Sequence, residues 1–157
     1  MDQGIYTVKI TGTYILDAPI DTVWKGLMSP NILANCIPGC QSFDLVDHDK
    51  YDMTVNVKVG PMNGKFQGTI SIVDQEVQNS YRLIAEGKGS VGFARGSALV
   101  TLSEFSGTTS LLVDGDLEIG GTIARVGQRI IGNVSKNMMD RFFECLTQSI
   151  AGDLSPN

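Results

Sequence analysis

The feature that most constrains the fold of this chain is a two-residue alternation of apolar and polar side chains that recurs in five segments. In the first segment, Tyr6, Val8 and Ile10 fall on one face, and polar residues separate them. This period is typical of a half-buried strand. The clear segments are 5–16, 50–59, 62–72, 81–89 and 109–119, and weaker strand signals occur at 41–46 and 92–102. Turn residues between the segments favour antiparallel pairing.

A helical period replaces the alternation in three places. Pro19 suits the first turn of a short helix, and Ser29 followed by Pro30 predicts the start of a second one. Thr122 follows two glycines and suits an N-cap, and from there the helical period continues to about residue 151. A helix of that length is roughly 40 Å long, enough to cross a whole sheet.

The order of these elements predicts the fold class. One strand, two short helices, about six further antiparallel strands and one long C-terminal helix indicate an α+β helix-grip. In this fold, a curved sheet of about seven strands wraps around the long helix. With 157 residues and no linker or repeat, the chain reads as a single domain, residues 1–157.

Composition excludes several classes of partner. A formal net charge of −5 and a pI near 4.7 argue against nucleic acid and against electrostatic binding to anionic lipid. The N-terminus lacks the pattern of a secretory signal, and no apolar run reaches the length of a membrane span. We therefore expect a cytoplasmic protein.

The three cysteines support the same compartment, because an odd number gives no disulfide framework. Cys36 and Cys40 flank a Pro-Gly turn, a spacing that a zinc clip allows, but the second ligand pair is missing. A thioredoxin-type redox pair would have two intervening residues rather than three. The interpretation that we prefer is a tight turn that carries small apolar thiols. The single histidine, His48, lies in a polar turn, and we expect it to be solvated.

The apolar faces of the five clear strands carry no Asp, Glu, Lys, Arg or His, so the strands present no general base. All four tyrosines lie on these faces. Glycines are also frequent there, and they have two interpretations. They relieve bends in a coiled sheet, or they leave unfilled volume. For the set as a whole we favour the second interpretation, an apolar pocket.

Four motifs in order give the sequence a family resemblance: CIPGC at 36–40, VGPMNGKFQG at 59–68, EGKGSVGFARGSALVTL at 86–102 and IGGTIARVGQRII at 119–131. They resemble the CoxG family, proteins similar to the CoxG subunit of carbon monoxide dehydrogenase, within the START-like (SRPBCC) helix-grip superfamily. The resemblance covers essentially the whole chain. It implies a hydrophobic ligand held between the sheet and the C-terminal helix.

The resemblance also implies partners. CoxG-like proteins accompany molybdenum-containing CO dehydrogenases and related hydroxylases, and they are implicated in recruiting the enzyme to the membrane by handling a lipophilic carrier such as a quinone. Many members have a C-terminal apolar extension, whereas this chain stops at AGDLSPN. We therefore expect a transient contact with the inner face of the membrane rather than an anchor. The resemblance and the composition leave a homodimer open.

The resulting prediction is a non-enzymatic binding protein that takes up a lipid-like or quinone-like molecule, with no covalent cofactor, catalytic residue or metal site. The residues expected to contact the ligand are Leu33, Ile37, Tyr51, Met53, Val55, Val57, Phe66, Gly68, Leu83, Phe93, Gly96, Leu117, Ile123, Gly127, Ile130, Val134 and Met138.

Two alternatives stay open. The first is a small-molecule enzyme of the same fold, such as a cyclase or hydrolase, which would need a buried acid or base. Glu104, Asp116, Glu118 or one of the tyrosines would have to point into the cavity. The second is an interaction module without a pocket, which docks on a partner enzyme and has a filled core.

Overall fold

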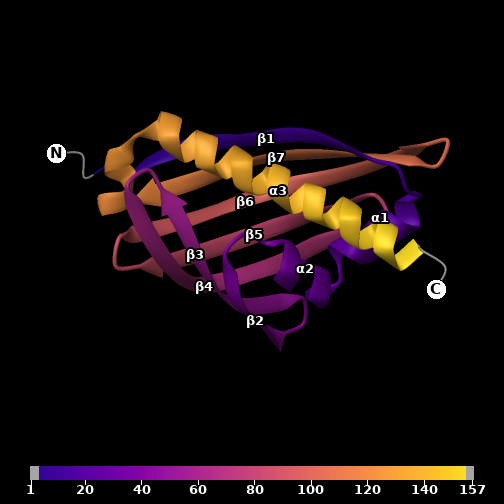
Figure 1. The fold of residues 1–157 in the computed structure, drawn as a ribbon, viewed down its shortest axis with the longest axis horizontal. Coiled ribbons are helices and arrows are strands. Elements are labelled where there is room, and N and C mark those ends of the chain that lie inside the picture. Colours follow the sequence, from indigo (N-terminus) through magenta and orange to yellow (C-terminus); the bar gives the residue numbers. More distant parts are fainter. Residues whose placement is uncertain (1–3, 155–157) are drawn as a thin grey trace.

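The computed structural model describes residues 4–154 and shows one antiparallel sheet of seven strands with a long helix across it (Figure 1). The strands lie side by side in the order β1-β7-β6-β5-β4-β3-β2. The elements are β1 (Tyr6–Leu16), α1 (Ile20–Leu27), α2 (Pro30–Cys36), β2 (Cys40–Asp47), β3 (Lys50–Val59), β4 (Met62–Glu76), β5 (Ser80–Gly89), β6 (Gly92–Phe105), β7 (Thr108–Gly120), the 3-10 helix η1 (Thr122–Val126) and α3 (Gln128–Leu154). The predicted α+β helix-grip is confirmed.

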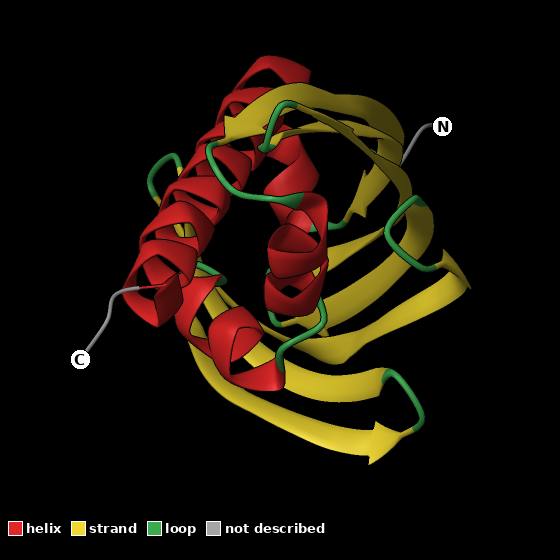
Figure 2. Ribbon diagram, turned by 90° about the vertical axis from the view of Figure 1, so that its right-hand side faces the viewer, coloured by secondary structure: helices red, strands yellow, loops and turns green. Residues whose placement is uncertain are grey.

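The sheet curves around the helices, which all lie on its concave side (Figure 2). Every strand except β1 pairs with its neighbour in sequence. β1 is the edge strand beside β7, and the two pair from Tyr6 opposite Ile119 to Leu16 opposite Thr109. Because the side chains of a strand alternate between the two faces, this register directs the apolar parity of each strand toward α3.

The second short helix begins as its sequence predicts, whereas the first begins just after Pro19 rather than with it. The Ser29 side chain accepts a hydrogen bond from the backbone N–H of Ile32 at 3.4 Å, and Pro30 occupies the first turn of α2. Pro19 lies one position before α1 and has extended backbone. Val23, Trp24 and Leu27 form the buried side of α1, so this helix packs inward near the C-terminal end of α3 (Figure 1).

The long C-terminal helix differs from the prediction of one continuous helix from Thr122. Residues 122–126 form a 3-10 turn, and α3 begins only at Gln128. Gly127 separates the two with a φ of +96°, a left-handed conformation that an L side chain rarely adopts. Within α3, Ile131 is buried while Ile130 is exposed.

Buried apolar side chains form two clusters rather than one. The larger core cluster lies between the sheet, α1, α2 and the C-terminal half of α3, and consists of Leu16, Ala18, Val23, Trp24, Leu27, Leu33, Tyr51, Ile70, Ile72, Tyr81, Val100, Leu102, Leu111, Val113, Phe143, Leu146 and Ile150. The smaller core cluster lies under η1 and the start of α3, and consists of Val59, Ile119, Ile123, Ala124 and Ile131.

The cysteines differ from the prediction. Cys36 at the end of α2 forms a disulfide with Cys145 on α3, with their Cα atoms 5.4 Å apart, and Cys40 is the free cysteine. Although the two half-cystines are 109 residues apart in sequence, α2 packs on α3 and brings them together. An odd count of three therefore does not exclude a disulfide, and the cysteine count gives no support for a reducing compartment.

The disulfide generates a prediction about stability. A cross-link that closes a loop of about 100 residues stabilises a fold by roughly 2–4 kcal/mol, because it restricts the unfolded chain. We expect C145S to lower the free energy of unfolding in urea by that order, and reductant to do the same to the parent protein. C40S is the matched control and should change nothing. Equal stability of C145S and the parent would contradict the pairing.

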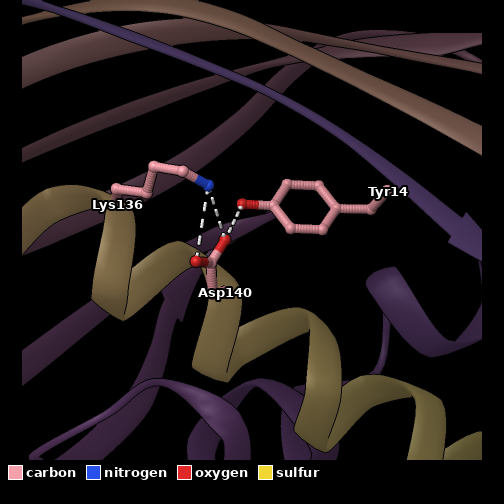
Figure 3. Close-up of polar contacts among 3 residues, drawn as sticks. All are labelled: Tyr14, Lys136 and Asp140. Carbon is pink, nitrogen blue, oxygen red and sulfur yellow. Dashed lines mark hydrogen bonds and ion pairs between the residues drawn. The ribbon is translucent and has the colours of Figure 1, made fainter.

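A side-chain hydrogen bond links β1 to the middle of α3 (Figure 3). The Tyr14 hydroxyl donates a hydrogen bond to Asp140 Oδ1 at 2.7 Å, and Lys136 Nζ, one turn earlier on α3, lies 3.1 Å from the same oxygen. The Tyr14 ring stacks on Phe143, with centroids 4.2 Å apart. These contacts hold α3 against the β1 side of the sheet.

The hydrogen bonds from Tyr14 and Lys136 lower the pKa of Asp140. Because the folded pKa is depressed, the stabilisation is present above the ordinary carboxyl value and is lost as the pH falls through the folded pKa. We expect NMR titration to place the Asp140 pKa below the ordinary carboxyl value and Y14F to raise it. An Asp140 pKa that does not change in Y14F would contradict the contact.

Candidate functional site

A cavity of about 260 Å³ lies between the first half of α3 and the concave face of the sheet. Its walls come from five strands, the end of α2, η1 and α3. The lining residues are Ile37, Met53, Val55, Val57, Val59, Phe66, Gly68, Ala85, Glu86, Gly87, Ala94, Leu117, Ile119, Ile123, Ile131, Val134, Ser135 and Met138. The larger core cluster fills the other end of the space beneath the helix, so the interior is packed at one end and hollow at the other.

The cavity wall is almost wholly apolar. Among its lining residues, Ser135 has the only hydroxyl and Glu86 the only charge. Glu86 is exposed, and strand alternation directs its side chain to the face opposite that of Ala85 and Gly87. The wall therefore presents no acid or base to a bound molecule, and it suits a ligand whose main free-energy gain is the removal of apolar surface from water.

Ten of the seventeen residues expected to contact a ligand line this cavity: Ile37, Met53, Val55, Val57, Phe66, Gly68, Leu117, Ile123, Val134 and Met138. Most come from β3, β4 and β7, where the alternation is regular and the register fixes the inward face. The pattern thus locates one wall of the cavity, and contact of these residues with a ligand stays a prediction.

Seven of the expected residues lie elsewhere. Leu33, Tyr51 and Leu83 belong to the packed end, where the first two are members of the larger core cluster and Leu83 packs against it. Gly127 forms the break before α3, and Ile130 is 37% exposed. Ile131 lines the cavity instead, at helical spacing from Val134 and Met138, and Ile130 lies at the edge of that face of α3.

The other two of these seven residues lie on β6, where the alternation is weak. Phe93 falls on the outer parity, and the Arg95 guanidinium lies 5.0 Å from the centre of its ring. Ala94, between them, lines the cavity instead. Gly96 lies inward, but a Cβ on it would collide with the Asp116 backbone oxygen, so this glycine permits close approach of β6 and β7.

Some lining residues were missed although the sequence contained a signal for them. Val59, Ala85, Gly87 and Ile119 occupy the inward parity of clear strands, so the same alternation identifies them. No simple pattern marks Ser135 on α3. It lies in the wall because it follows Ile131 by one turn on the same face of α3.

The inward glycines divide between the two interpretations. A Cβ on Gly68 would collide with the Glu86 backbone oxygen, so Gly68 is required by the close approach of β4 and β5. Gly87 lines the same cavity, but the nearest atom to its Cβ would be Phe66 Cβ at 3.4 Å, an ordinary contact. A methyl group therefore fits at Gly87, whereas none fits at Gly68.

The tyrosines do not provide a catalytic group in the cavity. Tyr6 donates a hydrogen bond to the Ala124 carbonyl at 2.7 Å, Tyr14 binds Asp140, and Tyr51 and Tyr81 lie in the larger core cluster. Burial raises the pKa of all four hydroxyls, so that they stay protonated near neutral pH.

The three candidate carboxylates face outward. Glu118 pairs with Arg95, Asp116 lies 3.3 Å from Lys9 Nζ, and Glu104 accepts a hydrogen bond from the Ile20 backbone N–H at 2.9 Å. Within the described part of the chain no cluster of three His, Cys, Asp or Glu residues could hold a metal ion. No helix in this same part combines the length and the apolar character needed to cross a membrane.

Residues 12–151 match the model of a family described as the CoxG subunit of carbon monoxide dehydrogenase. No curated protein matches the sequence. Among solved structures, a conserved protein from Geobacillus kaustophilus is 31% identical, with a TM-score of 0.89 and coverage of 92% of this chain and 96% of that chain.

Two enzymes share the fold at low identity. The aromatase/cyclase Zhui from a Streptomyces species is 10% identical, with a TM-score of 0.70 and coverage of 96% of this chain and 97% of that chain. Norcoclaurine synthase from Thalictrum flavum is 12% identical, with a TM-score of 0.63 and coverage of 96% and 98%. At these identities the likeness shows the START-like fold alone.

The two glycines of the cavity wall provide a test of its shape. We expect G87A to fold with unchanged or slightly higher stability, by up to about 1 kcal/mol, because alanine restricts the unfolded chain and its methyl group makes only an ordinary contact with Phe66 Cβ. G68A should destabilise by more than that, because its methyl group forces β4 and β5 apart. Urea unfolding of both variants measures the difference, and equal effects would contradict the cavity.

Proposed function

Because the chain belongs to the CoxG family of carbon monoxide dehydrogenase subunits, we propose that it is a non-enzymatic accessory protein that holds a hydrophobic small molecule, lipid-like or quinone-like, for a molybdenum-containing CO dehydrogenase-type oxidoreductase. The observation that carries the binding role is the apolar cavity of about 260 Å³. A hollow of this size forfeits packing contacts that a filled core would make, and a bound ligand restores them.

The proposed partners follow from the family name, and the proposed role from the site. An accessory protein needs no catalytic group of its own, and the described cavity wall presents none. The cyclase and synthase with this fold make the enzymatic alternative the natural competitor. An acid or base facing the cavity would favour that alternative, and the candidate residues Glu104, Asp116 and Glu118 lie on the outer surface instead. We place the protein in the cytoplasm, in transient contact with the membrane.

Binding in the cavity is tested with a neutral apolar probe, N-phenyl-1-naphthylamine, whose fluorescence rises in apolar surroundings. We expect the parent protein to bind it and G87L to bind it at least about tenfold more weakly, a loss of about 1.4 kcal/mol. The reason is that the leucine side chain projects into the cavity beside Phe66.

Gly132→Ala is the matched control, because its Cβ would meet only Val8 Cγ1 at 3.8 Å and Gly132 does not line the cavity. This variant should bind the probe like the parent. Removal of a helix-interior glycine should also raise its stability by about 1 kcal/mol or less. A parent protein that does not bind the probe, or a G87L variant that binds it equally well, would contradict the proposal. Co-purification with the oxidoreductase subunits tests the partner separately.

A further inference from the structure

We infer that Ser135 orients the ligand in the cavity by donating its hydroxyl hydrogen to an uncharged acceptor atom, such as a carbonyl oxygen. This inference rests on the proposed binding function and deepens it, because it assigns a residue that determines specificity and the group that this residue selects. Three observations lead to it: the position of Ser135 on α3, the lack of a bonding partner for its hydroxyl, and the apolar surroundings of that hydroxyl.

Ser135 lies in the row of side chains that α3 turns toward the sheet. Residues three and four positions apart share one face of a helix, and the neighbours of Ser135 in this row are apolar. Ile131, one turn earlier, is buried, Met138 lines the cavity, and Phe142 packs against the larger core cluster. An apolar residue between them would continue the core, whereas Ser135 places a small polar group there.

The hydroxyl of Ser135 has no partner within residues 4–154, the part of the chain that the structure describes. A serine or threonine inside a helix usually points to solvent or bonds the backbone carbonyl four residues earlier. Thr147, farther along α3, takes the second course and donates to the Phe143 carbonyl at 2.8 Å. Ser135 is half-buried and lines the cavity, so neither usual arrangement describes it. Its oxygen is also reachable, because no sealed side-chain oxygen of the described residues lacks a partner.

The surroundings of this hydroxyl leave the ligand as its partner. Ile131, Val134 and Met138 flank Ser135 in the cavity wall, and no other residue that lines the cavity has a hydroxyl. A water molecule held inside a protein usually makes about three hydrogen bonds, and a single hydroxyl among apolar side chains does not provide them. An atom of a bound molecule can bond the hydroxyl while the rest of that molecule covers the apolar wall.

The chemistry of the hydroxyl defines the ligand group that it selects. In proteins a buried donor without an acceptor is rarer than an acceptor with a spare lone pair, so the ligand atom that completes the site is an acceptor. A charged acceptor would be costly to bury, because no oppositely charged side chain faces the cavity to pair with it. An uncharged carbonyl oxygen meets both conditions.

A single polar group in an apolar wall gives direction to binding. Burial of apolar surface favours any molecule that fits and in any orientation, whereas one hydrogen bond favours the orientation that places the acceptor beside α3. A site that bonds a polar group of its ligand also discriminates against an analogue without that group. Ser135 therefore selects both the ligand and the way in which it lies in the cavity.

Two uncharged fluorescent probes test this assignment. Prodan, a naphthalene with a propionyl and a dimethylamino group, emits at longer wavelength when its carbonyl oxygen accepts a hydrogen bond, and N-phenyl-1-naphthylamine has no acceptor oxygen. We expect S135A to bind Prodan about fivefold more weakly than the parent, because one hydrogen bond is lost. The emission of the bound Prodan should move to shorter wavelength, and binding of N-phenyl-1-naphthylamine should not change.

Two variants serve as controls. S135T keeps the hydroxyl and should keep the Prodan emission of the parent, and T147A removes a hydroxyl of α3 that does not line the cavity and should change neither probe. If S135A leaves Prodan affinity and emission unchanged, or S135T shifts the emission as S135A does, the role of Ser135 is wrong while the cavity function stands. The same holds if the parent binds N-phenyl-1-naphthylamine but not Prodan. If the parent binds neither probe, the proposed function itself fails.

Discussion

The structure depends on how differently the two halves of α3 are packed: the C-terminal half lies in the larger core cluster, and the first half borders the cavity. Phe143, Leu146 and Ile150 at its C-terminal end pack into the larger core cluster against the sheet, α1 and α2. This packing, together with the stacking of Tyr14 on Phe143, supplies the apolar burial that holds the helix on the sheet. The first half of α3 is then supported from one end and from β1, so it spans the cavity without having to fill it.

The same division separates stability from binding. The larger core cluster contains the large aromatic side chains Trp24, Tyr81 and Phe143 and has aromatic contacts such as the edge-to-face pair of Trp24 and Tyr81, with centroids 5.7 Å apart. The cavity end has mostly aliphatic side chains and glycines, whose volumes leave space. In a fold built in this way, changes in the side chains of the cavity wall leave the packed end intact.

The sequence predicted the strands and much of the cavity wall because a period of two is determined locally. Val55, Val57 and Phe66 lie in the wall as their parity indicates, since their strands alternate regularly and pair in register. Phe93 and Ile130 lie outside it for physical reasons that a pattern does not contain. β6 begins in a glycine-rich stretch without clear parity, and Ile130 lies at the edge of the α3 face that Ile131, Val134 and Met138 present to the cavity. The disulfide depends on tertiary packing alone.

The disulfide has a topological consequence. The backbone from Cys36 to Cys145 and the bond between them form a closed ring that contains six of the seven strands, η1 and most of α3. Every residue that lines the cavity belongs to this ring. A protease that cuts one hairpin therefore leaves a single covalently joined molecule, whose cavity-lining segments stay tethered on both sides of the nick.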